Sequence, residues 1–345
     1  MVGPAGSGRV VRKKSKSKKI NMKRTKIVVI GGGTGTSTLV SAMKPMNLDM
    51  TAIVTVADSG GSTGRLRDEF GFQPVGDLRQ SLAALADEGT QEWIRKLLLY
   101  RFEKGDGLSG HNLGNLILTA LQDMAGSTAS ALEIAEKIFR LDGKIFPVTQ
   151  KNVQLVIELK DGTVLLGEDH LNDTKQHQEI KSVRLSPNAE LYELSKQAIQ
   201  QASVICVGPG DVYGSIVPAL AVKGLKKAVQ TSKSKIVFFV NLMNRANQTH
   251  QWPASKHLQL IEKYLGTSVD HIFINDAPVP KNVLKLYLEE GETLVTNDLA
   301  NDSRTKTYPF ISIATTKQSE SDVVKRSLIR HDADQIRKAV SDLLH

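Results

Sequence analysis

The sequence predicts an α/β fold built on an open, mainly parallel sheet. Short runs of β-branched and other apolar residues alternate with stretches whose apolar residues recur at helical spacing. Five of the predicted strands end in Gly, Asp or Asn, and three of these ends are rich in glycine. Ligands of open parallel sheets bind beyond the carboxyl ends of the strands. We therefore expect the glycine-rich turns to gather around one ligand at that edge.

The charge of the chain is unevenly distributed. Nine of the 45 basic residues and none of the 36 acidic residues lie within residues 1–24, so the rest of the chain has no net formal charge. We expect residues 1–24 to form a disordered basic tail that can bind anionic partners, and residues 25–345 to form the folded domain. The neutral domain does not indicate a specific nucleic-acid-binding face.

The cysteine content and hydropathy indicate a cytoplasmic protein. The single cysteine, Cys206, lies in an apolar run and cannot form a disulfide within the chain. No apolar stretch of the sequence reaches the roughly 20 residues of a membrane span. The basic N-terminal segment also lacks the apolar core of a secretory signal.

The first predicted strand, residues 26–30, ends in a glycine-rich turn that opens a helix. The turn comprises Gly31, Gly32, Gly33, Thr34 and Gly35. Glycines let main-chain N–H groups approach a phosphate, and the start of a helix adds unpaired donors. The sixth position of the dinucleotide pattern G-x-G-x-x-G is Thr36, and no lysine follows as in a Walker A loop. The alternative to a phosphate-binding loop is a tight structural turn.

A second strand, residues 50–57, ends at Asp58. A carboxylate at this position can hold a ribose hydroxyl, a metal ion or the turn itself, and Asp58 is a candidate for catalysis and for Mg²⁺. The turn that follows combines glycines, hydroxyl groups and an arginine suited to phosphate: Ser59, Gly60, Gly61, Ser62 and Arg65. The alternative role of Arg65 is that of an exposed residue at the start of a helix.

Two further helix starts carry candidate ligand contacts. Asp77 is a suitable N-cap, whereas Arg79 lies in the first turn, where the helix dipole disfavours a cation, which suggests an anionic partner. His111, Asn112 and Asn115 cluster before the next apolar helix. His111 can contact the ligand or act as a general acid or base, with a structural role as the alternative, and Asn112 can cap the helix.

The sequence pattern changes near Pro147, from alternating helices and strands to a predicted β-hairpin. Apolar strands at 153–159 and 163–166 flank Asp161-Gly162, which is a strong hairpin signal. We interpret residues of about 145–187 as a β-hairpin insertion in the domain, acting as a cap or an oligomer element.

The alternation of helices and strands then resumes. A strand at 203–207 ends in the third glycine-rich turn, and strands at 235–240 and 270–274 end in asparagines. The candidate ligand contacts here are Gly208, Pro209, Gly210, Tyr213, Ser215, Asn241 and Asn275. Residues 310–313 are a candidate last edge strand, and helices around 323–329 and 334–344 close the chain.

Taken together, these motifs resemble those of the gluconeogenesis factor (YvcK-like) family, which is related to 2-phospho-L-lactate transferase (CofD-like). The resemblance runs from about Lys26 to the C-terminus. It is carried by the turn at 31–35, VADSGGSTGRLR at 56–67, GDLR at 76–79, NLGNL at 112–116, GPG at 208–210 with Tyr213, SIVP at 215–218 and IRHD at 329–332.

The resemblance implies a Rossmann-like three-layer sandwich that binds a UDP-sugar such as UDP-N-acetylglucosamine. It also implies a role in carbon metabolism, cell shape and cell-wall synthesis. By the same resemblance Tyr287 and Arg330 join the site, where Tyr287 can stack on uracil and Arg330 can bind a phosphate. We expect a non-catalytic homo-oligomer. The alternative is a Mg²⁺-dependent phosphotransferase of the 2-phospho-L-lactate transferase type, and a third reading, an NAD-dependent oxidoreductase, lacks the sixth-position glycine.

The sequence departs from the family pattern at three places. Ser59 stands where the family has a second aspartate, which weakens metal binding at this turn. Asp211 stands where the family has a serine, and a carboxylate beside a diphosphate is unfavourable unless Mg²⁺ or an arginine intervenes. His250 and Lys256 replace two family acids. If these positions contact the ligand, we expect the ligand preference of this protein to differ from that of a typical family member.

Overall fold

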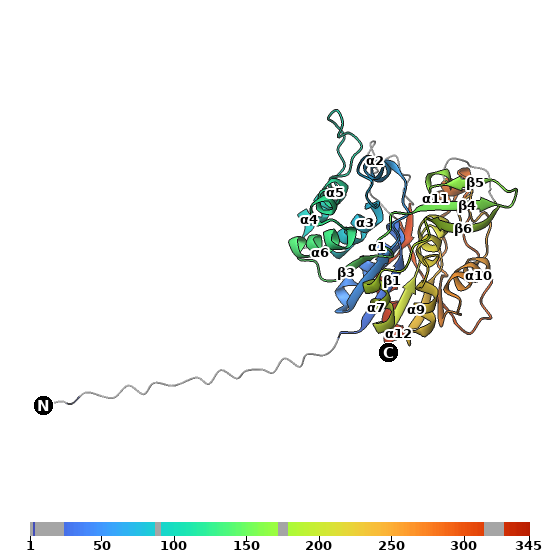
Figure 1. Ribbon diagram of the computed structural model, residues 1–345. Helices are drawn as coiled ribbons and strands as arrows, with labels where there is room; N and C mark the ends of the chain where they lie inside the picture. Colours follow the sequence, from blue (N-terminus) through green and yellow to red (C-terminus); the bar gives the residue numbers. More distant parts are fainter. Residues whose placement is uncertain (1–2, 4–23, 87–90, 172–178, 314–327) are drawn as a thin grey trace.

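A seven-stranded parallel sheet forms the centre of the fold (Figure 1). The computed structural model describes residues 3, 24–86, 91–171, 179–313 and 328–345. The strands of the sheet, in spatial order, are β10 (Thr305–Tyr308), β9 (His271–Asn275), β8 (Lys235–Phe239), β7 (Val204–Val207), β1 (Lys26–Gly31), β2 (Asp49–Val54) and β3 (Lys144–Pro147). Every neighbouring pair is parallel. The order reverses between β1 and β7, so the predicted parallel α/β sheet is confirmed as a doubly wound one.

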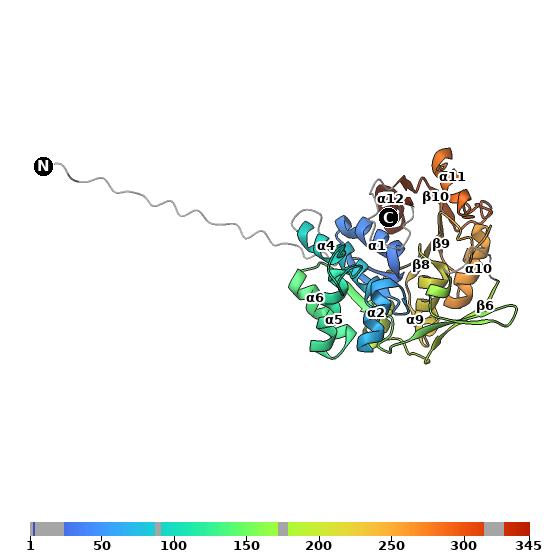
Figure 2. The same ribbon diagram turned by 90° about the horizontal axis from the view of Figure 1, so that it is seen from above.

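Helices cover both faces of this sheet, as the buried, β-branched strands require. On one face α1 (Gly33–Met43) packs between α3 (Gly76–Leu85) and α12 (Ala333–Leu344). The helices of the other face are α7 (Glu193–Gln201), α8 (Val217–Leu220), α9 (Leu225–Thr231) and α10 (Ala254–Leu265). Figure 2 shows α1 and α12 on one side of β8 and α9 on the other. The result is the three-layer sandwich that the resemblance implies.

A group of helices between β2 and β3 lies beside the sandwich (Figures 1 and 2). It consists of α2 (Gly61–Phe70), α4 (Glu92–Leu99), α5 (Leu113–Ala125) and α6 (Thr128–Phe139), with α5 packed against the other three. Leu98 is buried in this group, but Trp93 on the same helix is 73% exposed.

The segment read as an insertion forms a separate antiparallel sheet. Its strands are β4 (Gln154–Leu159), β5 (Val164–Leu166) and β6 (Ile180–Ser186), in the order β5–β4–β6. The predicted hairpin around Asp161-Gly162 is confirmed as β4 and β5, and β6 adds a third strand that the sequence did not predict. The start of the predicted range, β3, pairs with β2 in the main sheet.

A strand forms at the predicted residues 310–313, but it is not the edge strand of the main sheet. The edge strand of the main sheet is β10, and Pro309 separates it from β11 (Ile311–Ile313), which pairs antiparallel with β12 (Ile329–His331). Proline has no N–H to continue the ladder, so the chain leaves the sheet there. Most of the helix predicted at 323–329 lies outside the described residues, whereas the C-terminal helix is confirmed as α12.

The remaining elements are short or peripheral. They are η1 (Lys44–Met46), η2 (Asp169–Leu171), η3 (Val212–Ile216) and α11 (Lys281–Glu289). Among the helices that the structure describes, none has the length and apolar character needed to cross a bilayer.

Candidate functional site

The first and third glycine-rich turns pack directly on each other where the strand order reverses. A Cβ atom built on Gly35 would lie 2.0 Å from the carbonyl oxygen of Pro209, so this position accepts only glycine. Gly33 has a positive φ of 60°, and a Cβ atom there would lie 3.5 Å from the Ser215 hydroxyl. The two turns therefore form one continuous surface beyond the carboxyl ends of β1 and β7.

Asp77 joins this surface from the start of α3. Its carboxylate accepts a hydrogen bond from the N–H of Gly33, the first residue of α1. The N-cap of α3 itself is Val75. The expected capping role of Asp77 is thus fulfilled on a neighbouring helix, and not on its own. A Cβ atom on Gly32 would lie 2.3 Å from this carboxylate, which places Asp77 in contact with the first turn.

Asp58 lies next to this group, at the end of the second predicted strand. Its carboxylate accepts hydrogen bonds from the N–H of Gly60 at 2.9 Å and from the Thr63 hydroxyl. A Cβ atom on Gly76, the first residue of α3, would lie 2.4 Å from Asp58 Oδ2. The second glycine-rich turn is thereby fixed against the helix that carries Asp77.

Ser59 does not point its hydroxyl toward the glycine turns. Its Oγ accepts hydrogen bonds from the N–H groups of Glu168 at 2.8 Å and Asp169 at 3.2 Å, at the end of the β4–β5 hairpin. Two acidic residues of the insertion therefore reach the site, and sequence reasoning missed both. The available signal was the Gly-Glu-Asp sequence that follows β5, but nothing local links it to a residue more than 100 positions earlier.

Asp211 is the fifth acidic residue of this region. Its Oδ1 accepts a hydrogen bond from Gly214 N–H at 2.8 Å, which caps η3, and its Oδ2 accepts one from Gln248 Nε2 at 3.3 Å. Arg245 Nε lies 4.0 Å from the same carboxylate. An arginine side chain therefore lies beside this carboxylate.

Burial and neighbouring negative charges raise the pKa of three of these carboxyl groups, those of Asp58, Asp77 and Glu168. Burial, followed by the charge of Asp58, raises the pKa of Asp77 to about 8, although the hydrogen bond from Gly33 and the charge of Arg79 oppose the shift. Burial also raises the pKa of Asp58 and raises that of Glu168 well above its ordinary value, with the other carboxylates adding to the effect. We call Asp58, Asp77, Glu168, Asp169 and Asp211 the acidic cluster. It favours a cation or the hydroxyl groups of a ligand.

A buried polar network supports the second turn from behind. Ser62 Oγ lies 3.2 Å from His111 Nδ1 and accepts a hydrogen bond from Asn115 Nδ2 at 3.3 Å, while Arg79 Nε donates to Asn115 Oδ1 at 2.8 Å. Burial, and then the charge of Arg65, lower the pKa of His111. Asn112 caps α5 by accepting a hydrogen bond from Asn115 N–H. These residues hold α2, α3 and α5 together.

Three candidate residues lie at more open positions. Nothing lies within 4 Å of a Cβ atom built on Gly61. Arg65 is exposed, and its guanidinium reaches the carbonyl oxygen of Ser109 at 3.5 Å. The Thr34 hydroxyl donates to Gln80 Oε1 at 3.3 Å. Thr36, at the unusual sixth position, is fully buried beneath Gly31.

The end of β8 connects the third turn to the C-terminal part of the chain. The Asn241 side chain accepts a hydrogen bond from Gly210 N–H at 3.2 Å and donates one to Gly210 O at 2.7 Å. The carbonyl oxygen of Val240 lies 3.1 Å from Nε2 of His331 in β12. This contact places β12, and with it Arg330, at the same edge of the sheet as the glycine turns.

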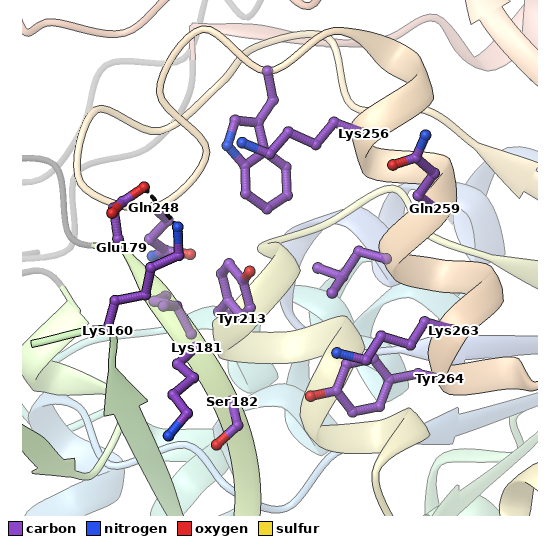
Figure 3. A pocket seen from close by; sticks show the side chains of 13 residues that line it. Lys160, Glu179, Lys181, Ser182, Tyr213, Gln248, Lys256, Gln259, Lys263 and Tyr264 are labelled. Atoms are coloured by element: carbon purple, nitrogen blue, oxygen red, sulfur yellow. Dashed lines mark hydrogen bonds and ion pairs between the residues drawn. The ribbon is translucent and has the colours of Figure 1, made fainter. Parts of the chain in front are cut away.

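Tyr287, Asn275 and Tyr213 occupy three different places. The Tyr287 hydroxyl accepts a hydrogen bond from Ile329 N–H at 2.9 Å, so Tyr287 lies next to the strand that carries Arg330. Asn275 instead forms a local turn with Ala277. Tyr213 is buried and lines a pocket between η3, β6 and α10 (Figure 3).

The candidate residues that the described contacts bring to the carboxyl edge of β1, β2, β7 and β8 form about half of the predicted set. They are Gly31, Gly32, Gly33, Gly35, Asp58, Gly60, Asp77, Gly208, Pro209, Gly210, Ser215 and Asn241. Within the described part of the chain, no three His, Cys, Asp or Glu side chains lie close enough together to hold a metal ion.

The family profile, the curated relatives and the solved structure that match this chain all point to one protein family. The sequence profile described as 2-phospho-L-lactate transferase CofD matches residues 27–315. The gluconeogenesis factor of Halalkalibacterium halodurans is 35% identical over 321 residues, which cover 92% of this chain and 96% of that protein. The gluconeogenesis factor of Bacillus subtilis is 34% identical over 324 residues, with coverages of 93% and 98%. A crystal structure of a Bacillus halodurans protein gives a TM-score of 0.84 at 34% identity, covering 92% of this chain and all of that one.

Proposed function

This chain belongs to the 2-phospho-L-lactate transferase CofD family and is a relative of the gluconeogenesis factors, and on that premise we propose that it is a cytoplasmic gluconeogenesis factor that binds a UDP-sugar. A ligand such as UDP-N-acetylglucosamine would make the protein a regulator of carbon metabolism, cell shape and cell-wall synthesis. One observation carries the proposal: the turn at Gly35 is in contact with the turn at Pro209, at the point where the strand order reverses. Doubly wound sheets bind nucleotides at this point.

The diphosphate would lie over the first and third turns. The first turn of α1 offers main-chain N–H groups and the positive end of a helix dipole. The hydroxyl of Ser215, which faces Gly33, supplies a further donor. Arg330 lies at the same edge of the sheet, beside Tyr287, and can hold a phosphate in a bidentate manner.

The acidic cluster would receive the sugar. Carboxyl oxygens accept hydrogen bonds whether the group is ionised or protonated, and sugar hydroxyl groups donate them. Asp58 and Asp77 flank the first helix start, so hydroxyl groups next to the diphosphate would reach them. Bare phosphate groups are repelled by the same carboxylates, which favours a ligand whose diphosphate is followed by a polyhydroxylated group.

Calorimetric titration with UDP-N-acetylglucosamine tests this proposal. We expect saturable binding, and we expect Ser215→Ala to weaken it by about fivefold or more, since one hydrogen bond to a charged phosphate is lost. Ser232→Ala is the matched control, because Ser232 ends α9 at the opposite edge of the sheet. An absence of heat at millimolar ligand with folded protein would reject UDP-sugar binding.

The acidic cluster favours a second candidate function, a Mg²⁺-dependent phosphotransferase. Buried carboxylates with raised pKa are suited to a divalent cation, and Mg²⁺ is usually bound by one or two carboxylates together with substrate phosphates. Asp58 and Asp77 would hold the ion, which would neutralise charge on a transferring phosphoryl group. Arg65, exposed on α2, would contact the same phosphates.

Incubation with a diphosphonucleoside donor, an acceptor and Mg²⁺ decides between the two functions. If the protein is a sensor, we expect no turnover. In that case we also expect the Asp58→Asn variant to bind the UDP-sugar still. Turnover that Asp58→Asn abolishes, while Asp68→Asn on the exposed part of α2 leaves it intact, would instead establish the phosphotransferase.

A further inference from the structure

A pocket of about 280 Å³ lies on the far side of η3 from the glycine turns. Figure 3 shows Lys160, Glu179, Lys181 and Ser182 of the small antiparallel sheet on one side of it and Lys256, Gln259, Lys263 and Tyr264 of α10 on the other. Tyr213 of η3 lies between them. The pocket is therefore built by the insertion and the main sandwich together.

The pocket carries an excess of positive charge. Its lining has four lysines and one carboxylate, that of Glu179. Lys160 pairs with Glu179 at 3.0 Å and Lys181 pairs with Glu158 at 2.6 Å. Lys256 and Lys263 are seven positions apart on one face of α10, and neither forms an ion pair with a carboxylate of the described residues. Two ammonium groups thus remain for an anionic ligand.

Trp252 positions one of these two ammonium groups. Lys256 Nζ lies 4.4 Å from the centroid of the Trp252 ring, a cation–π arrangement that restricts the lysine side chain. Tyr213 meets the same indole edge to face, with ring centroids 6.1 Å apart. The ammonium group is thereby held at one end of the pocket.

Two further lining residues have unmet hydrogen-bonding capacity. Gln248 is 1% exposed and Trp252 is 8% exposed. Oε1 of Gln248 and Nε1 of Trp252 are buried, and neither atom has a hydrogen-bond partner among the described residues. A buried polar atom without a partner costs about 1–3 kcal/mol. One atom is an acceptor and the other a donor, so hydroxyl groups of a ligand can satisfy both.

We infer that this pocket is a separate binding site for a small phosphorylated sugar. The phosphate binds the ammonium group of Lys263. The ammonium group of Lys256, which Figure 3 shows at the other end of the pocket over Trp252, binds sugar hydroxyl groups together with Gln248 and Trp252. The volume of about 280 Å³ lies just below the usual range for ligand pockets, about 300–1,000 Å³, so it suits a single sugar better than a nucleotide sugar. Gln248 Nε2 also donates to Asp211, whose carboxylate caps η3, so the site adjoins the glycine turns without sharing their surface.

Fluorescence of Trp252 provides a direct measurement. The chain has two tryptophans, and Trp93 is 73% exposed on α4, so Trp93→Phe leaves Trp252 as the only reporter. We expect titration with glucose 6-phosphate to give a saturable change in emission. Glucose and inorganic phosphate, each tested alone, should bind about tenfold more weakly or worse, since each makes only half of the contacts.

Charge variants test the assigned contacts. We expect Lys256→Gln combined with Lys263→Gln to weaken glucose 6-phosphate by about tenfold or more, the loss expected for charge-assisted hydrogen bonds. Lys137→Gln, a matched substitution at an exposed position on α6, should have no effect. Lys256→Arg with Lys263→Arg should retain binding, which separates loss of charge from loss of folding.

Three results would overturn the inference. The first is the absence of any saturable change at millimolar glucose 6-phosphate. The second is inorganic phosphate binding as tightly as the sugar phosphate, which would remove the sugar from the assignment. The third is competition between glucose 6-phosphate and UDP-N-acetylglucosamine in calorimetry, since a separate site does not exclude the nucleotide sugar. If the protein does not bind a UDP-sugar, the proposed function fails, but the fluorescence titration with glucose 6-phosphate still tests the separate site.

Discussion

Asp77 shows how one side chain can connect two helices at the site. It belongs to the first turn of α3, but its carboxylate accepts the N–H of Gly33 at the start of α1 and lies against Gly32. Burial and the charge of Asp58 raise its pKa to about 8, so near neutral pH it carries a proton for much of the time. The unfavourable free energy of burying this carboxyl group is therefore located where we expect the ligand to bind.

The raised pKa of Asp77 makes stability depend on pH. The unfolded chain releases this proton near the ordinary pKa of 3.8 and the folded chain near 8, so between these values the folded state binds more protons and the free energy of unfolding falls as pH rises. We expect Asp77→Asn, which keeps an acceptor for Gly33, to be stabilising relative to the wild type by at least about 1 kcal/mol more at pH 8 than at pH 5. Urea denaturation at the two pH values measures the difference.

Asp68→Asn is the control for this measurement. The Asp68 side chain is 69% exposed and pairs with Arg67 on the surface of α2. Its substitution should leave the pH dependence of unfolding unchanged. If Asp77→Asn and the wild type lose stability equally between pH 5 and pH 8, the raised pKa of Asp77 is wrong.

At the scale of elements, the small antiparallel sheet contributes to the site through one contact. Ser59 Oγ accepts two N–H groups at the end of the β4–β5 hairpin, those of Glu168 and Asp169. This hydroxyl determines where the two acidic side chains lie relative to Asp58. A carboxylate at this position would instead add to the charge of the acidic cluster.

Removal of the Ser59 hydroxyl should loosen this element selectively. In Ser59→Ala two main-chain N–H groups lose their acceptor, and we expect amide hydrogen exchange at Glu168 and Asp169 to accelerate by about tenfold or more. Exchange in β1 and β7 should not change, because these strands lie in the centre of the main sheet.

Ser182→Ala serves for comparison in the same small sheet. Its hydroxyl donates to the side chain of Glu158 at 2.9 Å and holds no main-chain group. Exchange at Glu168 and Asp169 in this variant should match the wild type. Equal acceleration in both variants would show that the sheet is loosened by any substitution, and the specific role of Ser59 would be lost.

At the scale of the whole molecule, the parallel sheet could be predicted because its strands are local patterns. β1, β2, β7, β8 and β9 each form at the apolar run predicted for them, although β2 ends at Val54, before the predicted end of its strand. The meeting of the first and third turns follows from the same pattern, since the carboxyl ends of parallel strands share one edge.

Contacts between distant segments could not be predicted in this way. Glu168 and Asp169 reach the site only because the insertion folds back onto Ser59, and the sequence near them shows no sign of it. Position alone suggested that Asp77 caps its own helix and that residues 310–313 form a last edge strand. The actual partners of both segments, α1 and β12, are determined by tertiary packing.

The contact between Gly35 and Pro209 constrains how this protein can be recombined with a relative. The two turns come from opposite halves of the sequence and leave no space for a single methyl group between them. A chimera that joins the first half of this chain to the second half of another family member must therefore inherit both turns from the same parent. A crossover before the first turn or after the third turn keeps both turns from one parent and would preserve the fold. A crossover between them would bring together two turns that did not evolve in the same protein.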